Sequence, residues 1–193
     1  AAIPAVHADR LRAAEATGPV RLRRREPGFT ALLSAIVSQQ VSTASANAIW
    51  ARVCDAGLHE PDPVARADEA DLAACGLSRQ KIRYARALAE SGIDFDALHH
   101  ASDQEVIDTL VAVPGIGVWT AEIYAMFALG RPDVFCAGDL ALQEAARIAF
   151  DLPERPREKA LRAMAADWSP WRTVAATLLW QYYAVVKERE GVR

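Results

Sequence analysis

The chain has 193 residues, of which 52% are hydrophobic and 24% are charged. This composition excludes a disordered protein, and no apolar run reaches the roughly 20 residues that a membrane-spanning helix needs. The formal net charge of −3 argues against a protein that coats DNA nonspecifically, because such binding depends largely on Lys and Arg side chains that neutralise phosphates. We therefore expect a soluble globular protein that forms one functional unit.

Ala-rich segments with a 3.6-residue period dominate the chain, and alternating strand patterns are lacking, so we expect an all-α fold of roughly ten helices. Residues 30–56 follow Pro27-Gly28 and are interrupted by Ser38-Gln39-Gln40, which predicts a helix, a turn and a second helix. Two short helices should follow Asp62-Pro63 and Asp68, and this stretch should end at Gly76. Ser78 can cap the next helix, which has a basic edge and should extend to about residue 90.

Boundary signals are clearer in the second half of the chain. Ser102 to Glu105 forms a capping-box pattern, which predicts a helix to about Ala112, before the helix-breaking Pro114. Later helices are expected from just after Gly117 to Leu129, from Asp139 to Phe150, and from Pro156 onward. The last helix should extend to about Glu188, with Ser169 as its cap and Pro170 as its first helical residue.

The strongest local signal is the stretch LVAVPGIGVWTA at 110–121, in which two amphipathic helices flank Pro-Gly-Ile-Gly. The two glycines permit positive φ and leave backbone amides uncovered at the start of the second helix. Such amides suit a phosphate oxygen, and the Thr120 hydroxyl can add another donor. The alternative is a tight hairpin in which Gly115 and Gly117 only allow close helix packing.

Asp139 follows the hairpin at the start of a predicted helix. Asp is a favoured N-cap that contributes about 1 kcal/mol, so capping alone can explain its position.

The chain has three cysteines, Cys54, Cys75 and Cys136. Their number is odd and they contain no CxxC pair, so the sequence predicts neither a disulfide framework nor a zinc or iron-sulfur site. We expect three reduced, buried thiols.

Together, the hairpin and the aspartate resemble the helix-hairpin-helix glycosylase superfamily, whose order of hairpin, helix, loop and Asp appears here as PGIGVWTA followed by DVFCAGDLAL at 133–142. The resemblance extends to LLSAIVSQQVS at 32–42, GLSRQKIRYARAL at 76–88 and WSPWRTVAATLLW at 168–180. The segments follow the order and spacing of the alkylpurine branch, the 3-methyladenine DNA glycosylase II proteins.

The resemblance implies one glycosylase unit over residues 1–193, made of two helical lobes with a DNA-binding cleft where the hairpin and the aspartate meet. The helix-hairpin-helix motif would occupy about 102–129. The first lobe would include about 36–137, and the second would combine about 1–35 with 138–193.

The implied activity is that of a monofunctional DNA glycosylase, which hydrolyses the N-glycosidic bond of alkylated purines, of the 3-methyladenine and 7-methylguanine type. The partner would be double-stranded DNA containing alkylated bases, with the damaged base flipped out to initiate base excision repair. Asp139 would be the catalytic carboxylate, which stabilises positive charge on the sugar and orients or deprotonates the attacking water. No cofactor and no catalytic metal are implied.

Further residues match positions that contact DNA in the family. Trp119 and Trp180 match aromatic positions of the base pocket, where an indole face attracts a cationic base. The alternative is that Trp119, Trp168, Trp171 and Trp180 are simply core residues. Ile123 and Leu140 stand where some relatives place tyrosines, so the range of lesions can differ. The backbone contacts would come from the amides near Gly115, Gly117 and Val118 together with Thr120, and a monovalent cation can bind the carbonyls of Val111, Val113 and Ile116.

Gln39 and Gln40 match the segment that fills the space vacated by the flipped base. Gln40 is the first candidate for this wedge, and Val41 is the second. The alternative for the two glutamines is that both side-chain amides cap a helix break.

Two rival functions remain. A bifunctional glycosylase-lyase needs a nucleophilic lysine near the position of Trp119, but the chain has only Lys81, Lys159 and Lys187. A non-catalytic helix-hairpin-helix DNA-binding module leaves Asp139 and the tryptophans unexplained.

Nothing resembles a secretory leader, so we expect the protein in the cytoplasm, associated with the nucleoid if the source is bacterial. We also expect it to be a monomer.

Overall fold

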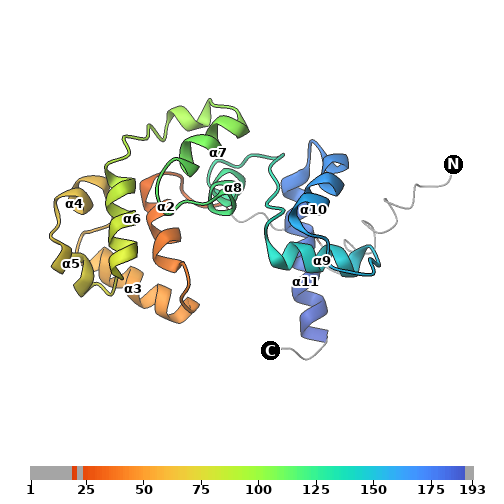
Figure 1. The fold of residues 1–193 in the computed structure, drawn as a ribbon, viewed down its shortest axis with the longest axis horizontal. Helices are drawn as coiled ribbons and strands as arrows, with labels where there is room; N and C mark the ends of the chain where they lie inside the picture. Colours follow the sequence, from red (N-terminus) through yellow and green to blue (C-terminus); the bar gives the residue numbers. More distant parts are fainter. Residues whose placement is uncertain (1–18, 21–23, 190–193) are drawn as a thin grey trace. The chain divides into compact units, whose positions relative to one another are not determined.

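The computed structural model describes residues 19–20 and 24–189, and all regular structure in these residues is helical (Figure 1). This confirms the all-α expectation. The chain forms two compact units. We call residues Arg25–Leu129 the hairpin unit, and residues Ala1–Arg24 with Gly130–Arg193 the aspartate unit. Within the described ranges, none of the helices has the length and apolar character needed to span a membrane.

The hairpin unit is built around one buried helix. α2 (Phe29–Ser38) packs against three other helices of this unit, and Leu32, Leu33, Ile36 and Val37 on it are at most 1% exposed. Apolar residues at this spacing line one face of a helix, which explains why α2 forms the core. The other elements are α3 (Thr43–Asp55), α4 (Pro61–Arg66), α5 (Glu69–Ala74), α6 (Arg79–Ala89), the 3-10 turn η1 (Ala97–His99), α7 (Asp103–Val111) and α8 (Val118–Phe127).

The aspartate unit has a core of packed helices and aromatic rings. α9 packs along α11 and also against α10. The ring of Trp168 is only 6% exposed and lies 5.2 Å from the Phe135 ring and 5.9 Å from the Phe150 ring, measured between centroids. Trp168 is therefore a core residue. The elements are α9 (Leu140–Ala149), α10 (Glu158–Ala165), the 3-10 turn η2 (Ala166–Trp168) and α11 (Arg172–Arg189).

The limits of the two units differ from the expected lobes of 36–137 and 1–35 with 138–193. The whole of α2 belongs to the hairpin unit because it packs on α3, α6 and α8. The segment 130–137 belongs with α11, because the Thr173 hydroxyl donates to the Arg131 carbonyl at 2.7 Å and the Thr173 amide donates to the Pro132 carbonyl at 3.0 Å. Residues 1–18 and 21–23 of the expected second lobe lie outside the described residues.

Local capping signals predict most helix starts correctly. The side chains of Ser78 and Ser102 accept hydrogen bonds from the first turns of α6 and α7, as predicted, and Ser42, which was not predicted as a cap, does the same for α3. Ser102 and Glu105 form the predicted capping box, with bonds in both directions. The predicted break near Gln39 is also confirmed, since α2 ends at Ser38 and α3 begins at Thr43.

Three helix starts that were predicted at prolines are wrong. α4 begins at Pro61 rather than after Asp62-Pro63. α10 begins at Glu158, two residues after Pro156, and α11 begins at Arg172 rather than at Pro170. The reason at α11 is Asp133, 39 residues earlier, whose Oδ1 accepts a bond from the Arg172 amide at 3.3 Å. Asp133 also accepts bonds from the Arg172 guanidinium at 2.7 and 2.9 Å and from the Ser169 hydroxyl at 2.7 Å.

Asp133 should make the stability of the fold sensitive to acid. The bonds from Arg172, followed by that from Ser169, lower the pKa of Asp133 from 3.8 to about 2. A carboxylate with a lowered folded-state pKa stabilises the protein above its unfolded pKa, and the contribution is lost as the pH falls toward the folded value. Asp133→Asn should therefore lower the free energy of unfolding by about 1–2 kcal/mol at pH 7, a value reduced for the partial exposure of Arg172.

Guanidinium chloride titrations at pH 7, 4 and 3 measure the difference between the two proteins. We expect it to be full at pH 7 and to fall by about half at pH 3. A difference that stays constant down to pH 3 would show that the carboxylate charge is not what stabilises the start of α11.

Candidate functional site

The hairpin turn between α7 and α8 uses its two glycines differently. Gly115 has a φ of 93°, in the left-handed region that favours glycine, and a Cβ at this position would collide with the ring of Tyr84. Gly117 has a φ of −88° and a ψ of 169°, which any residue adopts, and a Cβ there would meet no atom within 4 Å. Of these two glycines, the fold therefore requires only Gly115. Gly117 is exposed, and no neighbouring side chain blocks a ligand from its backbone amide.

α8 begins without a side-chain cap. Its N-cap is Gly117, and the first bond within the helix is donated by the Ala121 amide to the Gly117 carbonyl at 3.0 Å. Within the described residues, no acceptor meets the amides of Gly117 and Val118, which lie at the positive end of the helix dipole. The predicted row of surface donors is therefore present in the main chain. Thr120 is buried, with 8% of its surface exposed, so its hydroxyl does not extend this row.

The two glutamines after α2 have different environments. The side-chain amide of Gln39 donates from Nε2 to the Gly115 carbonyl at 2.9 Å. Gln40 is exposed and has a φ of 56°, and Val41 beside it is 39% exposed. The alternative in which both side-chain amides cap a helix break is wrong for Gln39, because its side-chain amide bonds to the hairpin.

Asp139 is the N-cap of α9. Its Oδ1 accepts hydrogen bonds from the Leu142 amide at 2.9 Å and from the indole Nε1 of Trp180, on α11, at 3.1 Å. The capping interpretation is thus confirmed, and it does not exclude a chemical role. The bond from Trp180 was not predicted, because the two residues are 41 positions apart and no local pattern links them.

The loop that leads to Asp139 is fixed through its main chain. The Gln143 side chain, which is 7% exposed, donates from Nε2 to the Ala137 carbonyl at 2.9 Å. Arg162 on α10 donates to the Phe135 carbonyl at 3.3 Å, and the Asp139 amide donates to the Cys136 carbonyl at 3.0 Å. The position of the Asp139 carboxylate is therefore set by α9 and α10, which both follow it in the sequence.

The remaining residues that the sequence analysis assigned to the pocket lie on three helices, α8, α9 and α11. Trp119 is in the first turn of α8 and is 47% exposed, and Trp180 on α11 is half-buried. Leu140, directly after Asp139, is 62% exposed, whereas Ile123 on α8 is half-buried. The structure thus joins Trp180 to Asp139 and Gln39 to the hairpin.

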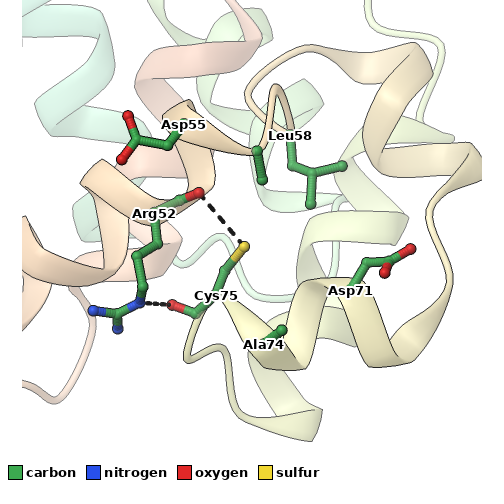
Figure 2. A pocket seen from close by; sticks show the side chains of 7 residues that line it. Arg52, Asp55, Leu58, Asp71, Ala74 and Cys75 are labelled. Carbon is green, nitrogen blue, oxygen red and sulfur yellow. Dashed lines mark hydrogen bonds between the residues drawn. The ribbon is translucent and has the colours of Figure 1, made fainter.

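A separate cavity in the hairpin unit contains none of these residues. Its volume is about 530 Å³. Figure 2 shows the side chains that line it. Arg52 donates to the Cys75 carbonyl at 2.8 Å, and the Cys75 thiol donates to the Arg52 carbonyl at 3.7 Å, which ties α3 to the end of α5. Burial raises the pKa of the Cys75 thiol, so it is protonated and unreactive at neutral pH. The lining residues are Arg52, Asp55, Ala56, Leu58, Asp71, Ala74 and Cys75.

The three cysteines are free; Cys75 and Cys136 are buried as expected, and Cys54 is half-buried. Within residues 19–20 and 24–189, no group of three or more His, Cys, Asp or Glu side chains is arranged to hold a metal ion.

Residues 33–170 match the HhH-GPD superfamily of base excision DNA repair proteins. The chain belongs to this superfamily. The crystal structure of a DNA-3-methyladenine glycosidase from Bacillus halodurans superposes with a TM-score of 0.86 at 37% identity, over 95% of this chain and 88% of that one. The 3-methyladenine DNA glycosylase of Schizosaccharomyces pombe, in complex with abasic DNA, gives 0.79 at 29% identity, over 90% of each chain.

A Bacillus subtilis protein that carries the name of a DNA-3-methyladenine glycosylase is 28% identical over 166 residues. The alignment covers 79% of this chain but only 58% of that protein. The part of this HhH-GPD protein that matches the superfamily contains the glutamine turn, the hairpin and Asp139, whereas Trp180 lies beyond it.

The two hairpin glycines of this HhH-GPD protein should respond differently to alanine. Gly115→Ala should destabilise the fold by about 2–4 kcal/mol, because it combines an unfavourable positive φ with an overlap on the Tyr84 ring. Gly117→Ala should cost at most about 1 kcal/mol, since only the preference for glycine over alanine at an N-cap is lost. Thermal melting of both variants measures this difference.

Gly117→Ala should nevertheless bind damaged and undamaged duplexes more weakly, because the new methyl group stands where a phosphate approaches the amides. Fluorescence anisotropy with both duplexes measures the effect. Unchanged affinity in the folded variant would mean that the hairpin amides do not hold the DNA backbone.

Proposed function

We propose that this protein is a monofunctional DNA glycosylase, which hydrolyses the N-glycosidic bond of alkylated purines in double-stranded DNA and so initiates base excision repair. The observation that carries the proposal is the Asp139 carboxylate, held at the start of α9 by the Leu142 amide and the Trp180 indole. Membership of the base excision superfamily and the names of the two solved relatives support the same activity.

The proposed chemistry needs only one carboxylate. Alkylation at N3 or N7 leaves the purine cationic and its glycosidic bond weak, so the leaving base requires no proton. As the bond breaks, positive charge grows on the sugar. A carboxylate about 4 Å away stabilises this charge by roughly 4 kcal/mol at an effective dielectric of 20, which corresponds to on the order of a thousandfold in rate. Asp139 would also orient or deprotonate the attacking water.

Trp180 has two roles in this proposal. Its indole N–H bonds to Asp139, which fixes the orientation of the ring, while the face of the ring remains suited to a cationic base. The exposed Trp119 is the second aromatic side chain that we propose to contact the flipped base. Stacking on these electron-rich rings would select charged purines over neutral ones.

The DNA backbone would be held by the hairpin. The amides of Gly115, Gly117 and Val118 are proposed to bind a phosphate, and the exposed Gln40 is proposed to fill the space left by the flipped base. Gln39 is less suited to that second role, because its side-chain amide is engaged by Gly115. A monovalent cation on the carbonyls of Val111, Val113 and Ile116 is also proposed; of these, the Val113 carbonyl already accepts a bond from the Ile116 amide at 3.1 Å.

A glycosylase-lyase is disfavoured by the lysines of the chain. Only Lys81, Lys159 and Lys187 are present, and none lies in the hairpin. Lys81 is buried, with its Nζ bonded to the Val37 carbonyl. We further propose that the protein acts as a monomer in the cytoplasm, at the nucleoid in a bacterium, because its substrate is genomic DNA.

The proposed activity should appear as release of free base from alkylated DNA. On DNA treated with a methylating agent, the protein should release 3-methyladenine or 7-methylguanine and leave intact strands that contain abasic sites. Sodium borohydride should trap no protein–DNA adduct, because only an imine intermediate can be reduced in this way. A trapped adduct would identify a lyase, and the absence of any released base in a protein that binds DNA would favour the non-catalytic module.

Asp139→Asn separates catalysis from capping. The amide oxygen of Asn can accept from the Leu142 amide and from Trp180, so the free energy of unfolding should change by no more than about 1 kcal/mol, mainly through the helix dipole. Single-turnover base excision should fall about a hundredfold or more, because a neutral amide stabilises no sugar cation and accepts no proton from water. Near-normal excision by the folded variant would leave Asp139 as a helix cap only.

A further inference from the structure

We propose that Gln39 is a positioning residue that couples the wedge, Gln40, to the hairpin that holds the DNA backbone. This inference rests on the proposed function, because both partners act only on DNA. Gln39 itself would touch neither the flipped base nor the phosphate.

The coupling begins with one hydrogen bond between segments 76 positions apart. Nε2 of Gln39 donates to the Gly115 carbonyl at 2.9 Å, and Gly115 is two residues before the open N-cap of α8. On the other side of Gln39, the backbone turns at once into the left-handed conformation of Gln40. One side chain therefore lies between the residue proposed to enter the DNA and the turn proposed to hold it.

Helix α6 supports both sides of this connection. Lys81 donates from Nζ to the Val37 carbonyl at 2.6 Å, in the last turn of α2, where a cation meets the negative end of the helix dipole. Tyr84, on the same face of α6, lies against Gly115, and its hydroxyl accepts a bond from Gln80 at 2.6 Å. The end of α2 and the hairpin turn are thus both held by one helix.

Such a connection has a mechanical consequence. Turning a nucleotide out of the stack costs a few kcal/mol, and contacts to the DNA must supply it. If Gln40 moved independently of the hairpin, its insertion into the DNA would not affect how well the hairpin amides bind the phosphate. With Gln39 in place, each contact should strengthen the other, so their energetic effects should be coupled.

A double-mutant cycle tests this directly. Gln40→Ala, Gly117→Ala and the double variant are compared for affinity to a duplex that carries a tetrahydrofuran abasic-site analogue. In the otherwise unchanged protein we expect the two effects to deviate from additivity by about threefold or more. In the Gln39→Met background, where the side chain keeps its length but has no donor, they should be additive within about 1.5-fold. The same non-additivity in both backgrounds, or additivity in both, would overturn the proposal.

Hydrogen exchange in the free protein gives a second readout that needs no DNA. The buried Ile116 amide donates to the Val113 carbonyl within the turn, so its exchange reports whether the hairpin has loosened. Gln39→Met should speed this exchange about fivefold or more, whereas the matched control Gln40→Met should not change it. Equal exchange in the two variants would mean that Gln39 does not hold the hairpin.

The outcomes distinguish this inference from the proposed function. If the unchanged protein releases no alkylated base but Ile116 responds to Gln39→Met, the glycosylase proposal fails while the structural connection stands. If the base is released and the cycle is unaffected by Gln39, only the coupling fails. Should Gln39→Met not fold, Gln39→Glu replaces it, because the added charge is common to all four members of the cycle and cancels.

Discussion

Oδ1 of Asp139 accepts hydrogen bonds from two helices of the aspartate unit, and the position of the candidate site in that unit depends on these two bonds. The Leu142 amide belongs to α9, which Asp139 begins, and the Trp180 indole belongs to α11, which packs along α9. The same carboxylate therefore joins the start of α9 to the middle of α11, two helices that already pack against each other. A group held by rigid elements in this way keeps its position when a ligand binds, which is what chemistry at a single carboxylate requires.

The hairpin unit uses the same principle with a different group. The groups proposed to bind DNA there are backbone amides, whose positions depend on the turn that carries them, so the residues around this turn must hold it in place. Tyr84 fills the side of Gly115 where a larger residue would need space, and Gln39 binds the Gly115 carbonyl. In both units, a side chain that is distant in the sequence holds the candidate site: Trp180 binds the Asp139 carboxylate, and Gln39 binds the hairpin turn.

This dependence on distant side chains also explains what could be predicted from the sequence. The all-α fold, the break after α2, the capping box at Ser102 and the hairpin all depend on residues within a few positions of one another, and they were predicted correctly. The start of α11 depends on Asp133, and the orientation of Trp180 depends on Asp139, and neither pairing leaves a local pattern. Burial of Thr120 was also missed, because periodicity alone does not say which neighbours cover the first turn of α8. The chemical roles of the site residues remain predictions.

The uncapped start of α8 has a consequence for how such a protein would search a genome. Neutral N–H groups hold a phosphate without displacing the counterions that lysine or arginine would displace, so each such contact adds little to the steep loss of affinity with rising salt. The net charge of −3 by itself also adds no long-range attraction toward DNA. In the proposed complex, binding would therefore depend on close fit more than on ionic strength, and the protein would spend little time held on undamaged duplex.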